Sequence, residues 1–233
     1  MCEIYSRLVS AVAEAMESII AWCIRYAPET ATRLRPPATR AEIDRAQAAV
    51  GVPWPDDLVE LYESMDGTEG AWLWPGAAPL STAALVETWN SRQRSSAIVR
   101  RDHARQLAAR PDWEIAAEQN LRAMAGLNGP PEDPYDVDRH EAQPAGTPAG
   151  IFIRSFLPIA NDGSGGHLIV DLRDGDERGS IKYFDKVDAD TGSRWWQSVE
   201  HLVTDVADGL QHGRMVQPYW TAEVEDGHLN WEI

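Results

Sequence analysis

Apolar residues recur every three or four positions at the start of the chain, and this spacing predicts a helix with one buried side. The apolar stripe comprises Tyr5, Leu8, Val12, Met16, Ile19, Cys23 and Tyr26. Pro28 cannot continue a helix, so we expect this helix to end there. The arginines and prolines of residues 33–38 predict an extended connector to the next helix.

Two shorter helices are predicted next from their end signals. Thr39 and Glu42 have the spacing of a capping box, in which each side chain satisfies a backbone N–H left free at the helix start. The helix that follows covers residues 41–50 and ends at Gly51, which tolerates the left-handed conformation. Pro55 begins another helix, whose apolar positions are Leu58, Leu61, Tyr62 and Met65.

The middle of the chain combines a long helix with a region rich in proline, glycine and acidic residues. Residues 71–74 predict a short strand, which would place Trp72 and Trp74 on the same face. A helix capped by Ser81 or Thr82 runs to about residue 107, and its arginines form either a basic patch or an ordinary solvated face. Residues 113–127 predict another helix, and residues 128–150 a long surface loop.

The last third of the chain predicts strands, a helix and a hairpin. The strand candidates are Ile151–Ile153, Phe156–Ala160, His167–Leu172 and Ser180–Phe184, with a turn over residues 161–166. Residues 196–211 have helical spacing, and the segments around Asp226 and Gly227 predict a closing β-hairpin. Strands and helices do not alternate regularly, so the pattern predicts an α+β fold with a central, mostly antiparallel sheet flanked by helices.

The charge balance changes which partners are expected. The chain has 37 acidic and 21 basic residues, a formal net charge of −16, which repels nucleic acids and anionic membrane surfaces. The same charge favours encounter with a basic protein, although solubility alone also explains an acidic surface. Two cysteines exclude a disulfide framework and suit a reducing, cytoplasmic compartment. The first segment contains no uncharged run near the roughly 20 residues that a bilayer demands.

No motif in the chain has the spacing of an active site, a cofactor site or a metal site. The six histidines and two cysteines form no zinc-binding pair, and residues 188–192 begin like a calcium loop but lack its later ligands. The glycines of residues 163–166 precede a strand rather than a helix, which favours a tight turn over a phosphate-binding loop. We therefore expect a protein that is not an enzyme and holds no cofactor or metal, while an unseen active site stays a weaker alternative.

Tryptophan is abundant, with ten residues in the chain. Most are expected in the core, and exposed ones would serve as binding anchors. Trp195 and Trp196 are neighbours and are expected to point in different directions.

Two blocks of sequence resemble the SUKH superfamily, named after yeast Smi/Knr cell-wall-synthesis regulators. The first block runs from Val52-Pro53 through Leu61-Tyr62 to Asp66-Gly67, and the second from Phe156-Leu157-Pro158-Ile159-Ala160 through Asp162-Gly163 to Asp171-Leu172. Together the matching regions cover residues 38–90 and 151–212. The resemblance implies an α+β fold and a role, common among bacterial members, as an immunity protein that neutralises a polymorphic or contact-dependent toxin. It brings no catalytic residues.

The chain departs from the resembled pattern at its start, in its middle and at His167, where an acidic or amide residue is common. Residues 1–37 add a helix and connector, and residues 92–150 form an insertion with a flexible loop, within a single domain of residues 1–233. We expect a protein partner, a basic toxin domain, to meet Trp72, Trp74, Asn161, Asp162, Ser164, His167, Asp185 and Asp188. A cytosolic scaffold or regulatory protein without a toxin partner is the alternative.

Overall fold

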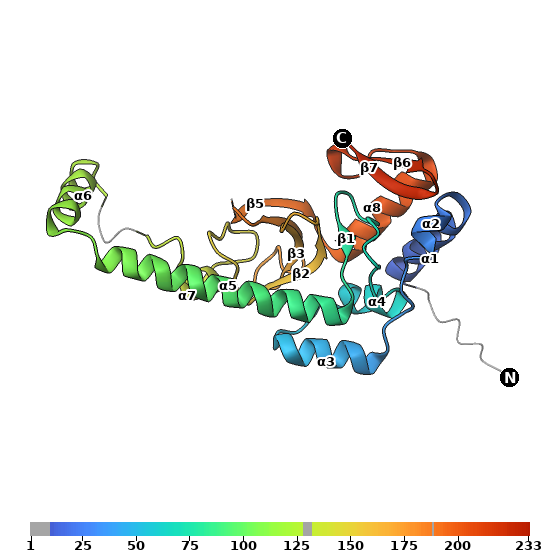
Figure 1. Cartoon of the computed structure of the whole chain (residues 1–233), viewed down its shortest axis with the longest axis horizontal. Helices are drawn as coiled ribbons and strands as arrows, with labels where there is room; N and C mark the ends of the chain where they lie inside the picture. Colours follow the sequence, from blue (N-terminus) through green and yellow to red (C-terminus); the bar gives the residue numbers. More distant parts are fainter. Residues whose placement is uncertain (1–9, 128–131, 188) are drawn as a thin grey trace.

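The central element is a five-stranded antiparallel sheet, which confirms the predicted α+β class. The computed structural model describes residues 10–127, 132–187 and 189–233 (Figure 1). In sheet order the strands are β1 (Ala78–Pro79), β2 (Phe156–Asn161), β3 (His167–Asp171), β4 (Ile181–Asp185) and β5 (Ala189–Trp196). Every neighbouring pair is antiparallel.

Both faces of the sheet are buried at its central strands, so nearly every residue of β2 and β3 is buried. On β3, Leu168 and Val170 contribute to the large core cluster, which also contains side chains of the surrounding helices. Ile169 points the other way and joins a smaller cluster with Phe152 and Phe184. This alternation follows from the two-residue period of a strand.

Helices α1 (Ala11–Tyr26), α3 (Arg40–Val50), α4 (Asp56–Ser64) and α8 (Val199–His212) contribute to the large cluster, and α2 (Pro28–Ala31) is a single turn. The predicted capping box of Thr39 and Glu42 is present, and Gly51 ends α3 with φ of 75°. Helix α1 buries Val12, Met16, Ile19 and Cys23 as predicted, but Tyr26 of the predicted stripe is 48% exposed. Tyr5 and Leu8 lie outside the described residues. None of the described helices is long and apolar enough to cross a membrane.

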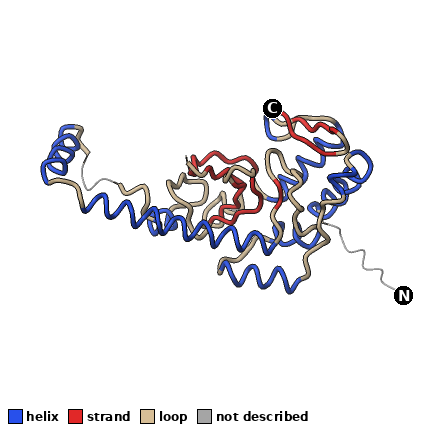
Figure 2. Tube along the Cα trace, in the orientation of Figure 1, coloured by secondary structure: helices blue, strands red, loops and turns tan. Residues whose placement is uncertain are grey.

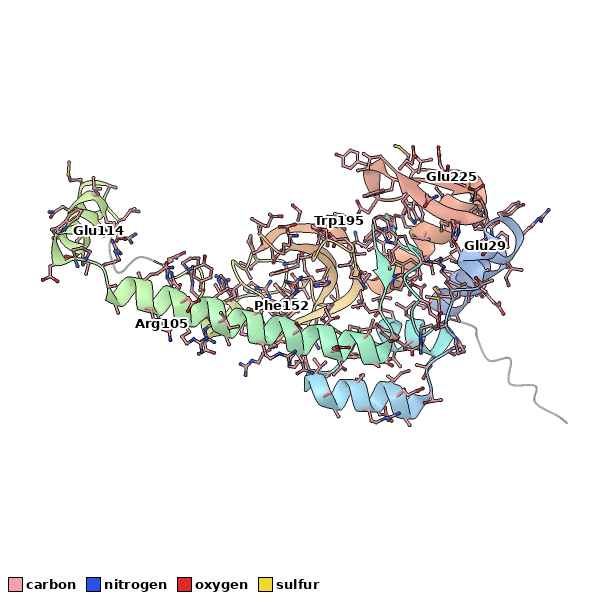
Figure 3. All side chains as sticks on the ribbon, in the orientation of Figure 1. Glu29, Arg105, Glu114, Phe152, Trp195 and Glu225 are labelled. Atoms are coloured by element: carbon pink, nitrogen blue, oxygen red, sulfur yellow. The ribbon has the colours of Figure 1, made fainter. Side chains whose placement is uncertain are left out.

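Helix α5 (Thr82–Ala108) runs along the sheet and then extends past it (Figures 1 and 2). Its middle is attached to the body because Gln93 and Ser96 donate hydrogen bonds to the carbonyls of Ile153 and Phe152. Phe152 lies between α5 and the sheet (Figure 3). The far end of α5 carries α6 (Asp112–Met124), which stands away from the sheet.

The surface loop predicted for residues 128–150 is only partly correct. Residues 128–131 lie outside the described part, but residues 137–142 form helix α7 (Val137–Ala142), and Ala145 and Ala149 are buried. The segment is attached to the sheet by a buried charge cluster of Asp171, Arg173, Lys182 and Asp190, whose side chains are at most 1% exposed. Arg173 of this cluster donates hydrogen bonds to the carbonyls of residues 140 and 147.

The predicted closing hairpin is confirmed as β6 (Thr221–Glu225) and β7 (His228–Glu232), preceded by the short 3₁₀ helix η1 (Gln217–Tyr219). The hairpin forms a separate two-stranded sheet beside α2 and α8 (Figure 2). Its turn is fixed by a hydrogen bond from Glu29 N–H to Gly227 C=O. Glu29 and Glu225 lie close to this contact in Figure 3.

Two predicted strands were wrong, and one strand was missed. Residues 71–74 form an irregular loop, since Trp74 pairs with Ala77 in a β-bridge of its own loop instead of with a neighbouring strand. Strand β1 begins only at Ala78. Residues 151–153 are buried but irregular, since their carbonyls bond to α5 side chains instead of a neighbouring strand. Strand β5 was not predicted, and the helix expected from Trp196 begins at Val199 with Ser198 as its cap.

Candidate functional site

A pocket lined mainly by aromatic rings opens beside the end of the sheet where β2 turns into β3. Its volume is about 250 Å³. The loop before β1, the turn after β2, strands β3 to β5 and the residue before β6 contribute its lining: Trp72, Pro75, Gly76, Ala77, Asp162, Leu168, Tyr183, Trp195 and Trp220. Figure 3 shows Trp195 at the edge of the sheet nearest the loop that leads into β1.

Tyr183 and Trp195 form the sheet side of this aromatic pocket. Their rings stack with centroids 5.4 Å apart and an interplanar angle of 15°. The pairing of β4 with β5 shifts between Ile181 opposite Trp196 and Lys182 opposite Arg194, so Trp195 is the extra residue of a β-bulge. Because of this bulge, Trp195 and Trp196 contact the same core cluster instead of opposite faces of the sheet.

Trp72 and Trp220 form the opposite side of the aromatic pocket. Trp72 is 42% exposed, and its carbonyl accepts a hydrogen bond of 3.1 Å from the indole of Trp231 in β7. Gly76 has a φ of 65° and lies against Trp220, whose ring would be 3.1 Å from any added Cβ. The C-terminal hairpin and the loop before β1 therefore hold each other in place.

Asp162 supplies the charged group of the aromatic pocket. One carboxylate oxygen accepts hydrogen bonds from the backbone N–H groups of Ser164, Gly165 and Gly166 at 2.7–2.9 Å. The other accepts from the hydroxyls of Ser164 at 2.8 Å and Tyr183 at 2.6 Å. Burial alone would raise the pKa of Asp162, but these bonds outweigh it and hold the pKa well below its usual value. Asp162 is therefore ionised at neutral pH.

The turn after Asp162 is the tight glycine turn that the sequence predicted. Gly163 and Gly165 have φ values of 71° and 104°, which side-chain-bearing residues rarely adopt. Gly166 has no room for a side chain, because an added Cβ would lie 2.1 Å from the Tyr183 hydroxyl oxygen. The glycines therefore allow the turn to close tightly enough for the Tyr183 hydroxyl to reach the Asp162 carboxylate.

Two cations support this turn from outside the aromatic pocket. Lys186 donates to the carbonyl of Ser164 at 2.6 Å, and Arg92 of α5 donates to the carbonyl of Gly165. Arg92 also donates to Nε2 of His167 at 2.8 Å. Burial and the nearby guanidinium lower the pKa of His167 to about 4, so this histidine is neutral at pH 7.

The predicted contact residues fall into three groups. Trp72 and Asp162 line the aromatic pocket, while Asn161 and Ser164 belong to the adjoining turn. Trp74 is fully buried in the core and His167 is 6% exposed, so neither is available to a partner. Asp185 is half-buried and accepts a hydrogen bond from Val187 N–H in the turn after β4, and Asp188 lies outside the described residues.

Tyr183, Trp195 and Trp220 were missed as pocket residues. Their aromatic character was visible in the sequence. No local pattern, however, shows that the bulge on β5 lies next to a loop more than a hundred residues earlier in the chain. The pairing of Trp220 with Gly76 is a tertiary contact of the same kind.

The chemistry of the aromatic pocket suits a side chain with an apolar stem and a cationic tip. Aromatic faces attract cations through the ring quadrupole, and the charge of Asp162, whose oxygens are already hydrogen-bonded within the chain, adds negative potential at the edge of the same cavity. Arginine and lysine have this combination of stem and charge. Among the described residues, no group of three histidine, cysteine, aspartate or glutamate side chains is placed to hold a metal ion.

These features define an α+β protein whose antiparallel sheet is enclosed on both faces and bears an aromatic pocket beside one end. A sequence model of the SMI1 / KNR4 family (SUKH-1) matches residues 37–205, well over half of the chain. The chain therefore belongs to the SMI1 / KNR4 family, which confirms the resemblance seen in the sequence. No curated protein sequence matches the chain closely.

Proposed function

We propose that this protein is an immunity protein that binds and neutralises a toxin domain, acting by binding and not by catalysis. The observation that carries the proposal is the aromatic pocket with Asp162 at its edge. Its rings are held by the sheet, by a bulge and by the C-terminal hairpin, so little side-chain freedom would be lost on binding. Membership of the SMI1 / KNR4 family supports the proposal, because bacterial members of the resembled superfamily are implied to be immunity proteins.

The proposed partner is a basic protein that places an arginine or lysine side chain in the aromatic pocket. The net charge of −16 favours approach of a positively charged surface and disfavours nucleic acids and anionic membranes. Aromatic residues in well-packed pockets are typical of the few positions that dominate a binding free energy. The proposed place of action is the cytoplasm, where a toxin that enters the cell would meet its inhibitor.

Co-expression with a candidate toxin domain from a neighbouring gene tests the proposal directly. We expect the wild-type chain to protect cells and to bind the purified toxin domain. Trp195→Ala should weaken binding at least tenfold, because it removes the ring stacked on Tyr183. Tyr219→Ala is the matched control, since Tyr219 is 67% exposed but lies outside the pocket lining, and it should change the affinity less than twofold.

Two results would contradict the proposal. If the wild-type chain neither binds the toxin nor protects cells, the immunity role is wrong, and the scaffold or regulatory role becomes the better explanation. If it protects equally well with Trp195→Ala, toxin neutralisation stands but the aromatic pocket is not its contact site.

A further inference from the structure

Helix α6 presents its apolar side to solvent. None of its side chains is buried. Trp113, Ala117, Leu121 and Met124 are spaced four, four and three residues apart and so form one stripe along the helix, called here the α6 stripe. Trp113 is 72% exposed, Leu121 67% and Met124 86%.

Two charged residues of α6 pair with an arginine that directly precedes the helix. Arg110, between α5 and α6, donates to Glu114 at 3.1 Å and to Glu118 at 2.6 Å. Both glutamates are more shielded from solvent than the apolar stripe. In the usual arrangement the apolar side of an amphipathic helix packs on the body, and α6 lacks this packing.

An apolar stripe that no described part of the chain buries indicates a surface that another molecule covers. Figures 1 and 3 show α6, with Glu114 labelled, at the end of the molecule away from the sheet and the C-terminal hairpin. Contiguous exposed apolar side chains of this size mark interaction surfaces. The stripe carries no charged residue, so the basic partner that suits the aromatic pocket does not suit it.

We propose that the α6 stripe is a self-association surface, covered by the α6 stripe of a second copy of this chain in antiparallel orientation. A two-fold axis near the middle of α6 would place Trp113 of each copy against Met124 of the other, a favourable sulfur–aromatic contact. The small side chain of Ala117 allows the helix backbones to approach closely.

The charges on α6 favour the antiparallel orientation. Asp112 and Glu114 lie in the first turn of the helix. A parallel pair would bring four carboxylates together, whereas an antiparallel pair places these turns at opposite ends. The helix dipoles also oppose each other in the antiparallel pair.

The size of the stripe sets the expected strength of association. Its four side chains offer on the order of 500 Å² per copy, so even complete coverage would bury only about 1,000 Å² in the dimer, at the lower limit for specific interfaces. We therefore expect a reversible dimer with a dissociation constant in the micromolar range. Because α6 lies on the projecting end of α5, two bodies of charge −16 can stay apart while the helices pair.

Sedimentation velocity of the full chain over a range of concentrations tests the proposal. We expect the wild type to shift from monomer to dimer, and Leu121→Glu to raise the dissociation constant at least tenfold. Ala123→Glu is the matched control, because it adds the same charge to an exposed position of α6 outside the stripe, and it should change the constant less than threefold. Helix α6 buries no side chain, so both variants should keep the wild-type melting temperature.

Cross-linking checks the orientation of the pair. In a Cys2→Ser background, a short bis-maleimide should link Ala117→Cys chains into dimers and leave Ala123→Cys chains largely unlinked, because residue 117 lies close to the proposed axis. A chain that stays monomeric at all concentrations, or a dimer that Leu121→Glu leaves unchanged, would overturn the proposal. Neither result depends on the identity of a toxin, so it would not affect the proposed function.

Discussion

Single polar residues fix the conformation of the turn after β2, although this turn is a partly exposed loop. Asp162 accepts five hydrogen bonds, three from backbone N–H groups, and so fixes the turn and the Tyr183 ring together. His167 lies behind this turn, within hydrogen-bond distance of the Arg92 guanidinium and near the Asp162 carboxylate. A proton added to His167 would place two positive charges side by side in a buried site.

The pH dependence of stability should therefore report on His167. The pKa of His167 is lowered to about 4 in the folded protein, against about 6.5 in the unfolded chain. Above pH 6.5 its contribution to stability is fully present, and it is lost as the pH falls towards 4, because only the unfolded chain takes up the proton. Between pH 7 and pH 5 the wild type should lose about 2 kcal/mol more free energy of unfolding than His167→Gln.

Urea denaturation at the two pH values measures this difference. His201→Gln, at an exposed histidine near the start of α8, is the control and should keep the wild-type pH dependence. Equal pH dependence of the wild type and His167→Gln would show that His167 is not held neutral in the folded protein.

At the scale of elements, the limits of a helix were predicted best where its capping residues lie next to it in the sequence. The capping box of Thr39 and Glu42 and the left-handed Gly51 give α3 nearly its correct limits. Strand β5 has no such signal, because its residues 190–194 include a glycine and are otherwise polar or charged. Its pairing depends instead on a buried ion pair between Asp190 and Lys182, a contact that only the folded sheet creates.

The buried charge cluster that contains this ion pair explains why residues 132–150 are more ordered than their composition suggests. Asp171, Arg173, Lys182 and Asp190 balance two negative charges with two positive ones out of contact with water. Asp171 also accepts a hydrogen bond from Gly146 N–H, and Lys182 and Arg173 lie about 5 Å from the Phe156 ring. Proline and glycine thus predict the irregular backbone on either side of α7, but neither that helix nor its attachment to the sheet.

Removing one member of the buried cluster should be costly. Lys182→Met leaves Asp190 without its cation, and we expect it to lower the free energy of unfolding by about 3–5 kcal/mol. The double variant Lys182→Met with Asp190→Leu should recover much of this loss, since no unpaired charge then remains buried.

Chemical denaturation of the single and double variants checks this expectation. Arg40→Met provides the control, because it breaks only exposed ion pairs with Asp44 and Glu63 and should cost less than about 1 kcal/mol. A Lys182→Met variant as stable as this control would mean that β5 and residues 132–150 do not depend on the cluster.

At the scale of the whole molecule, the two inferred surfaces lie on parts of different rigidity. The aromatic pocket joins the loop before β1, the central sheet and the end of the chain, all of which share the large core cluster. The α6 stripe lies on a helix that shares no buried side chain with that core. The body is therefore expected to unfold as one cooperative unit, while α6 opens locally.

Hydrogen exchange should separate these two behaviours. Helix α6 has 13 residues, a length at which an isolated helix is marginal in water. In dilute solution its amides should exchange at least ~100-fold faster than those of α8, which buries seven residues. Raising the protein concentration through the dimer range should slow exchange in α6 and leave α8 unchanged, because pairing covers only the α6 stripe. Leu121→Glu should abolish that concentration dependence. Protection of α6 equal to that of α8 in dilute solution would show that the helix is stabilised within its own chain, and the reason for proposing a second copy would disappear.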